Sequence, residues 1–171
     1  MVFFDTCVWI ELLGVSSPIT EKEETKARLV SQLLLESVKK NETIVTFSNQ
    51  ILELISATLK IKMREYNRYA KENGKKGVSN LKEFRKTREY QDAKLLCKSI
   101  CDDIKHFAKS EGNFEFSFDG LLNNLDIADI NDSIYYQFCE KNNCNLYTFD
   151  YDLLQIDNKS LVIHLQQNDN R

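Results

Sequence analysis

Short apolar segments alternate with longer segments of helical periodicity along most of the chain. The apolar segments are rich in β-branched or aromatic residues, and most of them end beside an acid or a polar residue, a pattern typical of buried strands. We predict strands at residues 2–4, 43–47, 146–149 and 161–165. Residues 111–118, with an alternating FEFSF, are predicted to be a strand or an extended connection. Strands that alternate with helices indicate a parallel sheet covered on both faces.

The first two predicted helices have recognisable starts. Thr6 follows the first strand and is positioned to cap a short helix whose apolar residues cluster on one side. Thr20 and Glu23 have the spacing of a capping box, which predicts a helix from there to about residue 40.

Two long helices are predicted in the middle of the chain, separated by a turn. Ser48 is expected to cap the first, over residues 49–71, and the sequence NGKKGV at 73–78 forms the turn. The second is expected over residues 80–109, and another helix starts near Ala128. The residues expected to face inward from the second long helix are Leu96, Ile100, Ile104 and Phe107.

The composition is that of a single globular domain. The chain has 171 residues, of which 42% are hydrophobic and 29% charged. No apolar run reaches the roughly 18 residues that suggest a membrane span, and the N-terminus does not resemble a signal peptide. Five irregularly spaced cysteines indicate free thiols, and two histidines are too few for a recognisable zinc set. We therefore expect a cytoplasmic protein without a membrane partner.

Charge is distributed unevenly along the chain. Residues 60–98 contain thirteen Lys or Arg against five Asp or Glu, a local charge of +8. Residues 119–171 contain three basic against nine acidic residues, a local charge of −6. A basic segment beside an acidic one suits a nucleic-acid grip next to a metal site. A helical surface of solvated lysines would give the same basic count, so charge alone leaves both interpretations open.

Four acids occupy comparable places beside predicted strands. Asp5 and Asp150 follow strands directly, Glu53 lies in the helix after the second strand, and Asp132 lies near the start of a late helix. The carboxyl ends of parallel strands meet at one edge, where these acids would converge. Clustered carboxylates repel one another unless a cation neutralises them, and oxygen ligands favour Mg²⁺ or Mn²⁺. Asp129 is a further candidate ligand, or a helix-start residue stabilised by the macrodipole.

The chemistry that fits such a site is metal-assisted hydrolysis of a phosphodiester bond. A bound metal lowers the pKa of water enough to give a hydroxide nucleophile at neutral pH. No Ser-His-Asp or Cys-His arrangement is evident as a competitor. Gly74 and Gly77 belong to a basic turn with no strand before it, so they do not form a phosphate-binding loop.

Three segments resemble those of PIN-domain nucleases, which include VapC-like and PilT N-terminus-like ribonucleases. VFFDTCVWIELL resembles the opening strand, Asp-Thr and short apolar helix of that family. TIVTFSNQILELIS resembles its second strand and following helix. NDSIYYQFCEKNNCNLYTFDYD resembles its closing motif, in which an acid opens a helix and Thr-x-Asp ends the next strand. The likeness covers roughly residues 1–55 and 125–165, in the family's order.

The resemblance implies a three-layer α/β/α fold around a central, mostly parallel sheet, and a Mg²⁺- or Mn²⁺-dependent endoribonuclease. Thr148 would orient the catalytic site by hydrogen bonding, and Thr6 would do the same. Asp129 and Asp152 match acids that accompany the motif in some members. The metal ligands that the resemblance implies are Asp5, Glu53, Asp132 and Asp150.

Two features depart from the family pattern. Cys7 stands where the family often has Asn. Residues 58–109 are longer than the matching segment of compact members, and we expect a helical insertion or arm that grips RNA backbone. The nucleic-acid-binding candidates on this arm are Lys82, Arg85, Lys86 and Arg88. The residues that would either stack on unpaired bases or pack between helices are Tyr66, Tyr69 and Tyr90.

The resemblance also implies partners. Many small prokaryotic members with this layout are VapC-type toxins, which are homodimers held inactive by an antitoxin protein. RNA, an antitoxin and a second copy of the chain are therefore the expected partners. The alternative is a PIN-like scaffold that binds RNA or protein without catalysis. A haloacid-dehalogenase-type phosphatase is disfavoured, because it requires an Asp where this chain has Cys7.

Overall fold

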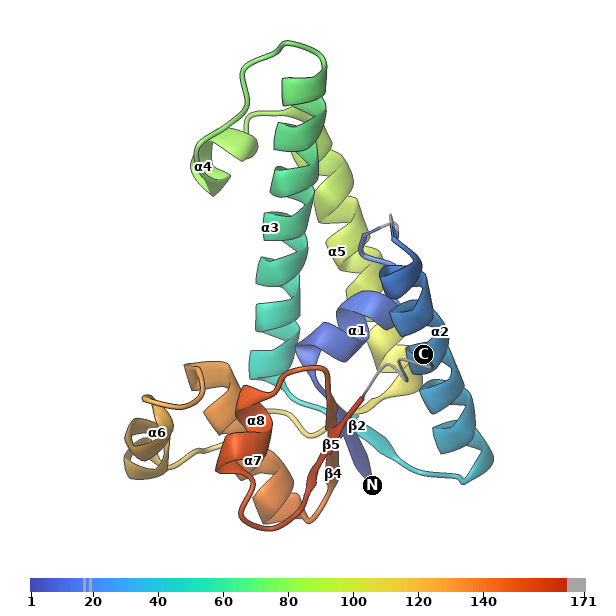
Figure 1. Cartoon of the computed structure of the whole chain (residues 1–171), viewed down its shortest axis with the longest axis vertical. Helices are drawn as coiled ribbons and strands as arrows, with labels where there is room; N and C mark the ends of the chain where they lie inside the picture. Colours follow the sequence, from blue (N-terminus) through green and yellow to red (C-terminus); the bar gives the residue numbers. More distant parts are fainter. Residues whose placement is uncertain (17, 19, 166–171) are drawn as a thin grey trace.

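A five-stranded parallel sheet lies at the centre of the computed structural model, which describes residues 1–16, 18 and 20–165 (Figure 1). The sheet order is β3-β2-β1-β4-β5, and every neighbouring pair is parallel. The strands are β1 (Val2–Phe4), β2 (Ile44–Thr46), β3 (Lys109–Ser110), β4 (Asn145–Thr148) and β5 (Val162–His164). The predicted parallel sheet is thus confirmed. In the stretch predicted as strand or connection, residues 111–117 form a connection, because pairing with β2 ends at Ser110.

Helices cover both faces of the sheet. Alternate strand residues point to opposite faces, so that Phe3 packs in one core cluster and Phe4 in the other. On the Phe3 face lie α6 (Phe118–Asn124), α7 (Ile130–Asn142) and α8 (Asp152–Ile156). On the Phe4 face lie α1 (Thr6–Leu12), α2 (Glu21–Lys39), α3 (Ser48–Glu72) and α5 (Arg88–Phe107). This arrangement agrees with an α/β/α layering of the predicted kind.

The helices α3 and α5 run side by side well past the sheet and form a long arm (Figure 1). At 25 residues, α3 is about 37 Å long. The predicted turn closes the arm's end, where the Asn67 side chain hydrogen-bonds to both backbone groups of Val78. The short helix α4 (Leu81–Phe84) packs near this tip.

Several helix boundaries differ from the prediction. The capping box of Thr20 and Glu23 is confirmed, but the cap positions of α1 and α3 are Asp5 and Phe47 rather than Thr6 and Ser48. The predicted helix over residues 80–109 is two helices, because the Thr87 side chain accepts a hydrogen bond from the Tyr90 amide and starts α5 afresh.

The predicted inward stripe of α5 is partly wrong. Ile100 and Ile104 are buried and Leu96 is half-buried, whereas Phe107 is 44% exposed. The stripe continues from Ile104 to the buried Ala108 four residues on, which leaves Phe107 on the flank. The short helices α6 and α8 were not predicted. None of the described helices is both long and apolar enough to cross a membrane.

The order of strands reverses direction beside β1. From β1 the chain adds β2 and β3 outward on one side, and later adds β4 and β5 on the other. In open parallel sheets, such a switch point opens a crevice at the carboxyl ends of the two strands that flank it. Asp5 directly follows β1, and Thr148 is the last residue of β4. The topology therefore places these two residues at the crevice.

Candidate functional site

Asp5 is held at the switch point by two side chains. Because Phe4 lies opposite Tyr147 in the sheet, the next residues along, Asp5 and Thr148, are neighbours. Thr148 Oγ1 donates to Asp5 Oδ2 at 2.6 Å, and Cys7 Sγ donates to the same oxygen at 2.9 Å. Asp5 is only 5% exposed, and this burial raises its pKa, although its hydrogen bonds lower it again. The carboxylate is thus fixed in orientation and poorly solvated.

Thr148 and Cys7 connect Asp5 to the loop after β4. Thr148 is fully buried, and its hydroxyl accepts a hydrogen bond from the Asp150 amide at 2.8 Å. The Cys7 thiol accepts from the Phe149 amide at 3.4 Å. Burial and the nearby Asp5 carboxylate raise the pKa of Cys7 well above its usual value, so the thiol stays protonated and can donate. Cys7 therefore supplies a polar contact to the first acid.

Glu53 reaches the cluster from the second turn of α3. Its Oε2 accepts a hydrogen bond from Thr6 Oγ1 at 2.8 Å and another from the Tyr135 hydroxyl. Burial and the Glu53 charge raise the pKa of Tyr135, which keeps the phenol protonated as a donor. Glu53 is thus oriented by α1 on one side and by α7 on the other, and Thr6 orients it rather than capping α1.

The sequence analysis did not identify two residues that orient the acids, Tyr135 and Gln50. Tyr135 lies three residues after Asp132, so its position on the same helix face was a usable signal. Gln50 lies three residues before Glu53 and is fully buried. Its Nε2 donates to the Phe4 carbonyl at 2.6 Å, and its Oε1 accepts from Thr46 at 2.8 Å. Gln50 therefore ties the start of α3 to β1 and β2 and sets the direction of Glu53.

Asp132 is a second acid of the cluster whose pKa is raised. It lies in the first turn of α7 and is 9% exposed. Burial first, and then the charges of Asp129, Asp5 and Asp150, raise its pKa to about 8. Asp129 is the cap of α7, where its side chain accepts hydrogen bonds from the amides of Asn131 at 2.8 Å and Asp132 at 3.0 Å. Asp129 therefore acts as the helix-start residue that was one of the two predicted alternatives, and it lies three residues before Asp132.

The remaining acids lie at the rim. Asp150 is exposed, follows β4, and accepts a hydrogen bond from the Asp152 amide at 2.9 Å. Asp152 is also exposed, begins α8, and accepts from Gln155 at 3.2 Å. The structure thus brings Asp5 and Asp150 within electrostatic reach of Asp132, and Glu53 within reach of Asp5. Asp152 is linked to this cluster through Asp150.

The cluster has the chemistry of a divalent-cation site, although its side chains are not closed around one point. Carboxylates, whose oxygens Mg²⁺ and Mn²⁺ prefer as ligands, gather there beside the hydroxyls and the thiol that orient them. Burial and then repulsion by neighbouring acids raise the Asp132 pKa, and a cation would offset this cost. Within residues 1–16, 18 and 20–165, no three His, Cys, Asp or Glu side chains already form a ready-made ligand set. Binding would therefore require rotation of side chains, for which the exposed Asp150 is best placed.

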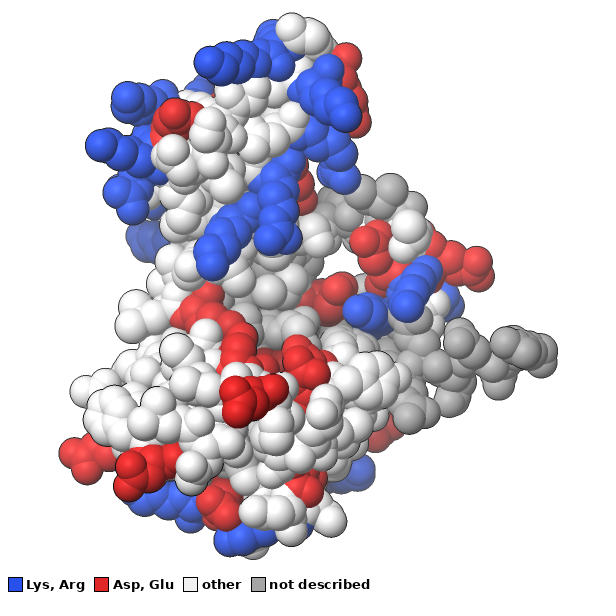
Figure 2. Space-filling view, turned by 60° about the vertical axis from the view of Figure 1, so that its left-hand side comes forward, with Lys and Arg blue, Asp and Glu red and all other residues white. Residues whose placement is uncertain are grey.

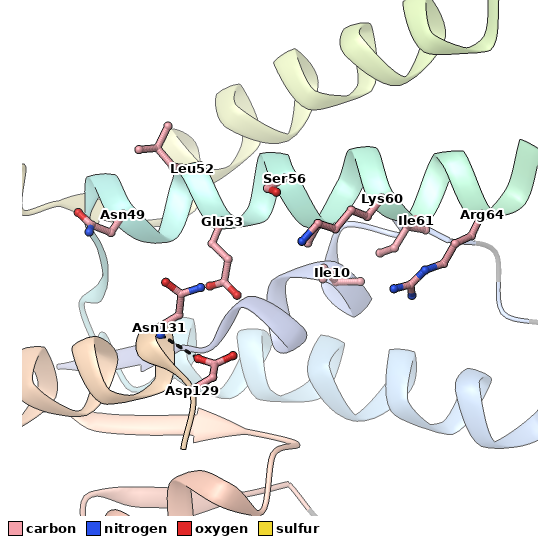
Figure 3. A pocket seen from close by; sticks show the side chains of 11 residues that line it. Ile10, Asn49, Leu52, Glu53, Ser56, Lys60, Ile61, Arg64, Asp129 and Asn131 are labelled. Atoms are coloured by element: carbon pink, nitrogen blue, oxygen red, sulfur yellow. Dashed lines mark hydrogen bonds between the residues drawn. The ribbon is translucent and has the colours of Figure 1, made fainter. Parts of the chain in front are cut away.

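A groove of about 610 Å³ leads from the cluster along α3 (Figure 3). Glu53 and Asp129 line its end at the cluster, and Lys60 and Arg64 line it further along α3. Ile10 of α1 forms part of the opposite wall. The groove therefore joins the acidic cluster to the basic arm.

The predicted nucleic-acid-binding residues lie elsewhere. They are all exposed and lie on α4, just after it, or at the start of α5, namely Lys82, Arg85, Lys86 and Arg88. Their place near the tip of the arm is far from the cluster at its base (Figure 1). Tyr66 and Tyr90 pack against the buried Phe84, with ring centroids 5.8 and 5.7 Å away, which is the packing alternative. Tyr69 remains 55% exposed.

Comparison of the sequence with protein-family models and with curated proteins gave no match.

Proposed function

We propose that the protein is a Mg²⁺- or Mn²⁺-dependent endoribonuclease that hydrolyses phosphodiester bonds with a water activated at the carboxylate cluster. The observation that carries the proposal is the burial of Asp5 and Asp132 beside each other at the switch point of the sheet. Burial raises the pKa of both carboxyl groups, and neighbouring acids raise that of Asp132 further. Charged carboxylates in such surroundings destabilise a fold, and a divalent cation is the partner that offsets this cost.

The residues that would hold the cation are Asp5, Glu53, Asp132 and Asp150. A bound divalent cation supplies a lowered pKa for water and stabilises charge on the phosphate oxygens. Thr148 and Cys7 keep Asp5 in one orientation, while Thr6 and Tyr135 do the same for Glu53. Pre-oriented ligands of this kind increase both metal affinity and activity.

The test is cleavage of end-labelled single-stranded and structured RNA, with and without Mn²⁺. We expect Asp5→Asn and Asp132→Asn each to reduce the cleavage rate by at least about 100-fold, because each removes a ligand charge. Asp126→Asn is the matched control, since Asp126 is exposed and lies shortly before the same helix. It should cleave at the wild-type rate. Cleavage that survives both cluster substitutions would contradict the proposed function.

One observation favours a second candidate, a PIN-like scaffold that binds RNA or protein with little catalysis. The described side chains do not form a closed ligand set, and the same would be true of a site that has lost its catalytic function. The scaffold would bind RNA but show no Mn²⁺-dependent cleavage in the same assay.

A toxin role, with an antitoxin protein and a homodimeric state, belongs to the proposal through resemblance alone. Inhibition of the cleavage by the product of a short adjacent reading frame would support the toxin role. Light scattering of the purified chain would measure its oligomeric state.

A further inference from the structure

A basic pair faces the same groove as the carboxylate cluster. Glu53, Lys60 and Arg64 recur at helical spacing, and Figure 3 shows their side chains extending from the same side of α3. Along the helix axis, Lys60 lies about 10 Å and Arg64 about 16 Å beyond Glu53. The three side chains therefore form a line that leads away from the cluster.

Lys60 and Arg64 are not neutralised by the protein. Both are exposed, and among the salt bridges of the described residues neither takes part in one. Lys62, two residues from Lys60, behaves differently, because it pairs with Glu65 at 2.8 Å and lines a separate pocket between α3 and α5. Lys60 and Arg64, which line the groove, thus have no salt bridge among the described residues, whereas Lys62 on the same helix has one.

The groove also offers apolar surface between its charged ends. Ile10, Ala57 and Ile61 line it together with Lys60 and Arg64. A polyanion with apolar rings attached, such as an unpaired nucleic-acid strand, matches this mixture of cations and apolar side chains. A base-paired duplex keeps its base faces stacked inside and would leave that apolar surface uncovered.

We propose that Lys60 and Arg64 form a phosphate-binding subsite for the backbone of single-stranded RNA. They hold phosphates a few nucleotides from the one that lies at the carboxylate cluster. This inference rests on the proposed function. It narrows the substrate to an unpaired strand and places the path of that strand in the groove along α3. Figure 2 agrees with this layout, with basic side chains on the arm above acidic side chains at its base.

The experiment measures binding of a fluorescent single-stranded oligoribonucleotide by anisotropy at several salt concentrations. The full chain carries Asp132→Asn throughout, which prevents cleavage during the measurement. The double substitution Lys60→Gln/Arg64→Gln is compared with Lys62→Gln and with Lys82→Gln/Arg85→Gln. Each lost phosphate contact reduces the slope of log K against log salt by about 0.7 for single strands. We expect the groove variant to lose about 1.4 in slope and roughly tenfold in affinity, and the other two to stay within about twofold.

The inference would be overturned by an unchanged salt slope in the groove variant, by an equal loss in the arm-tip variant, or by no RNA binding of the parent chain. Competition by duplex RNA or polyglutamate as strong as that by single-stranded RNA would also overturn it. The proposed function fails on a different readout, namely cleavage that persists in Asp5→Asn and Asp132→Asn. A chain that cleaves RNA with Mn²⁺ but keeps its salt slope in the groove variant refutes the subsite alone.

Discussion

The base and the arm of this protein carry charge in opposite ways. At the base, Asp5 and Asp132 are almost fully buried, and their pKa values are raised. On the arm, the basic residues from Lys82 to Arg88 are exposed to solvent. Exposed lysines and arginines cost a fold little and occur on most helical surfaces, whereas buried carboxylates are expensive. The buried acids are therefore the stronger sign of function, although the basic segment at residues 60–98 is more conspicuous in the sequence.

The same contrast applies within α3. Glu53 is held by Thr6 and Tyr135, and Lys62 by Glu65, while Lys60 and Arg64 face an open groove. Fixed groups suit a role that needs pre-orientation, such as holding a cation. Long, unpaired cations suit a role that tolerates variable geometry, such as contact with a flexible backbone.

Among the residues that orient the acids, the largest effect is expected at Thr148, whose hydroxyl joins the two central strands. Thr148→Val removes the 2.6 Å bond to Asp5 and the acceptor of the Asp150 amide. We expect the cleavage rate to fall by about 10- to 100-fold. Loss of these buried bonds should cost about 1–3 kcal/mol, which lowers the melting temperature on the order of 5 °C. Thr148→Ser keeps the hydroxyl and should restore most of the rate; equal defects in both variants would mean that the methyl group is what matters.

A smaller loss is expected at the residue that orients Glu53 from α7. Tyr135→Phe removes one of two hydrogen bonds to Glu53, and Thr6 remains as the other donor. We expect about a tenfold lower cleavage rate and a higher Mn²⁺ requirement. Tyr136→Phe is the matched control, because the Tyr136 hydroxyl bonds to Asn158 at 2.8 Å, away from the cluster. If the two variants lose activity equally, Tyr135 has no specific role at Glu53.

The stability of the cation-free protein should fall as pH rises. The Asp132 pKa is raised from 3.8 to about 8 by folding, so between these values the folded state binds more protons than the unfolded state. Stability is therefore highest near and below pH 4 for this group, and it decreases towards pH 8. Asp132→Asn, which stays uncharged, should melt on the order of 3 °C higher than wild type at pH 8 in EDTA. This difference in melting temperature should shrink at pH 5. A difference that stays constant across pH would contradict a raised pKa of Asp132 in the folded protein.

The smallest effect is expected at the arm tip. Lys82→Gln/Arg85→Gln removes two exposed charges far from the cluster. We expect the cleavage rate at physiological salt to change by less than about twofold, because distant exposed charges are screened within about 8 Å. A large loss of cleavage rate would indicate that the main RNA contact lies at the tip of the arm.

The sequence predicted those parts of the molecule that local chemistry decides. Asp5 after an apolar strand and Thr20 with Glu23 at capping-box spacing were read from adjacent residues, and the structure places them as expected. The parallel order of strands predicted that the four acids converge, and the structure brings Asp5 and Asp150 near Asp132, and Glu53 near Asp5, without a closed ligand set among the described residues. The break at Thr87 was missed because a Thr within a helical pattern can either continue the helix or cap a new one.

Other features depend on packing between distant segments. Which face of α3 borders the groove is decided by α1 and α7, so Lys60 and Lys62 cannot be told apart by sequence spacing alone. Likewise, Ala108 is buried where Phe107 was expected to be, because of the way in which α5 meets β3. The burial of Asp132, which the account of the site depends on most, also became visible only in the fold.

Calorimetric titration with Mn²⁺ tests directly whether the carboxylate cluster binds a divalent cation. Near pH 7 we expect one class of site on the wild-type chain and release of close to one proton per ion, since Asp132 must ionise to bind. Titration in buffers with different ionisation enthalpies measures that proton. In Asp132→Asn the affinity should fall at least about tenfold and the proton release should disappear, while Asp126→Asn should behave as wild type. Absence of Mn²⁺ binding, or equal binding by Asp132→Asn, would contradict a cation site at the carboxylate cluster.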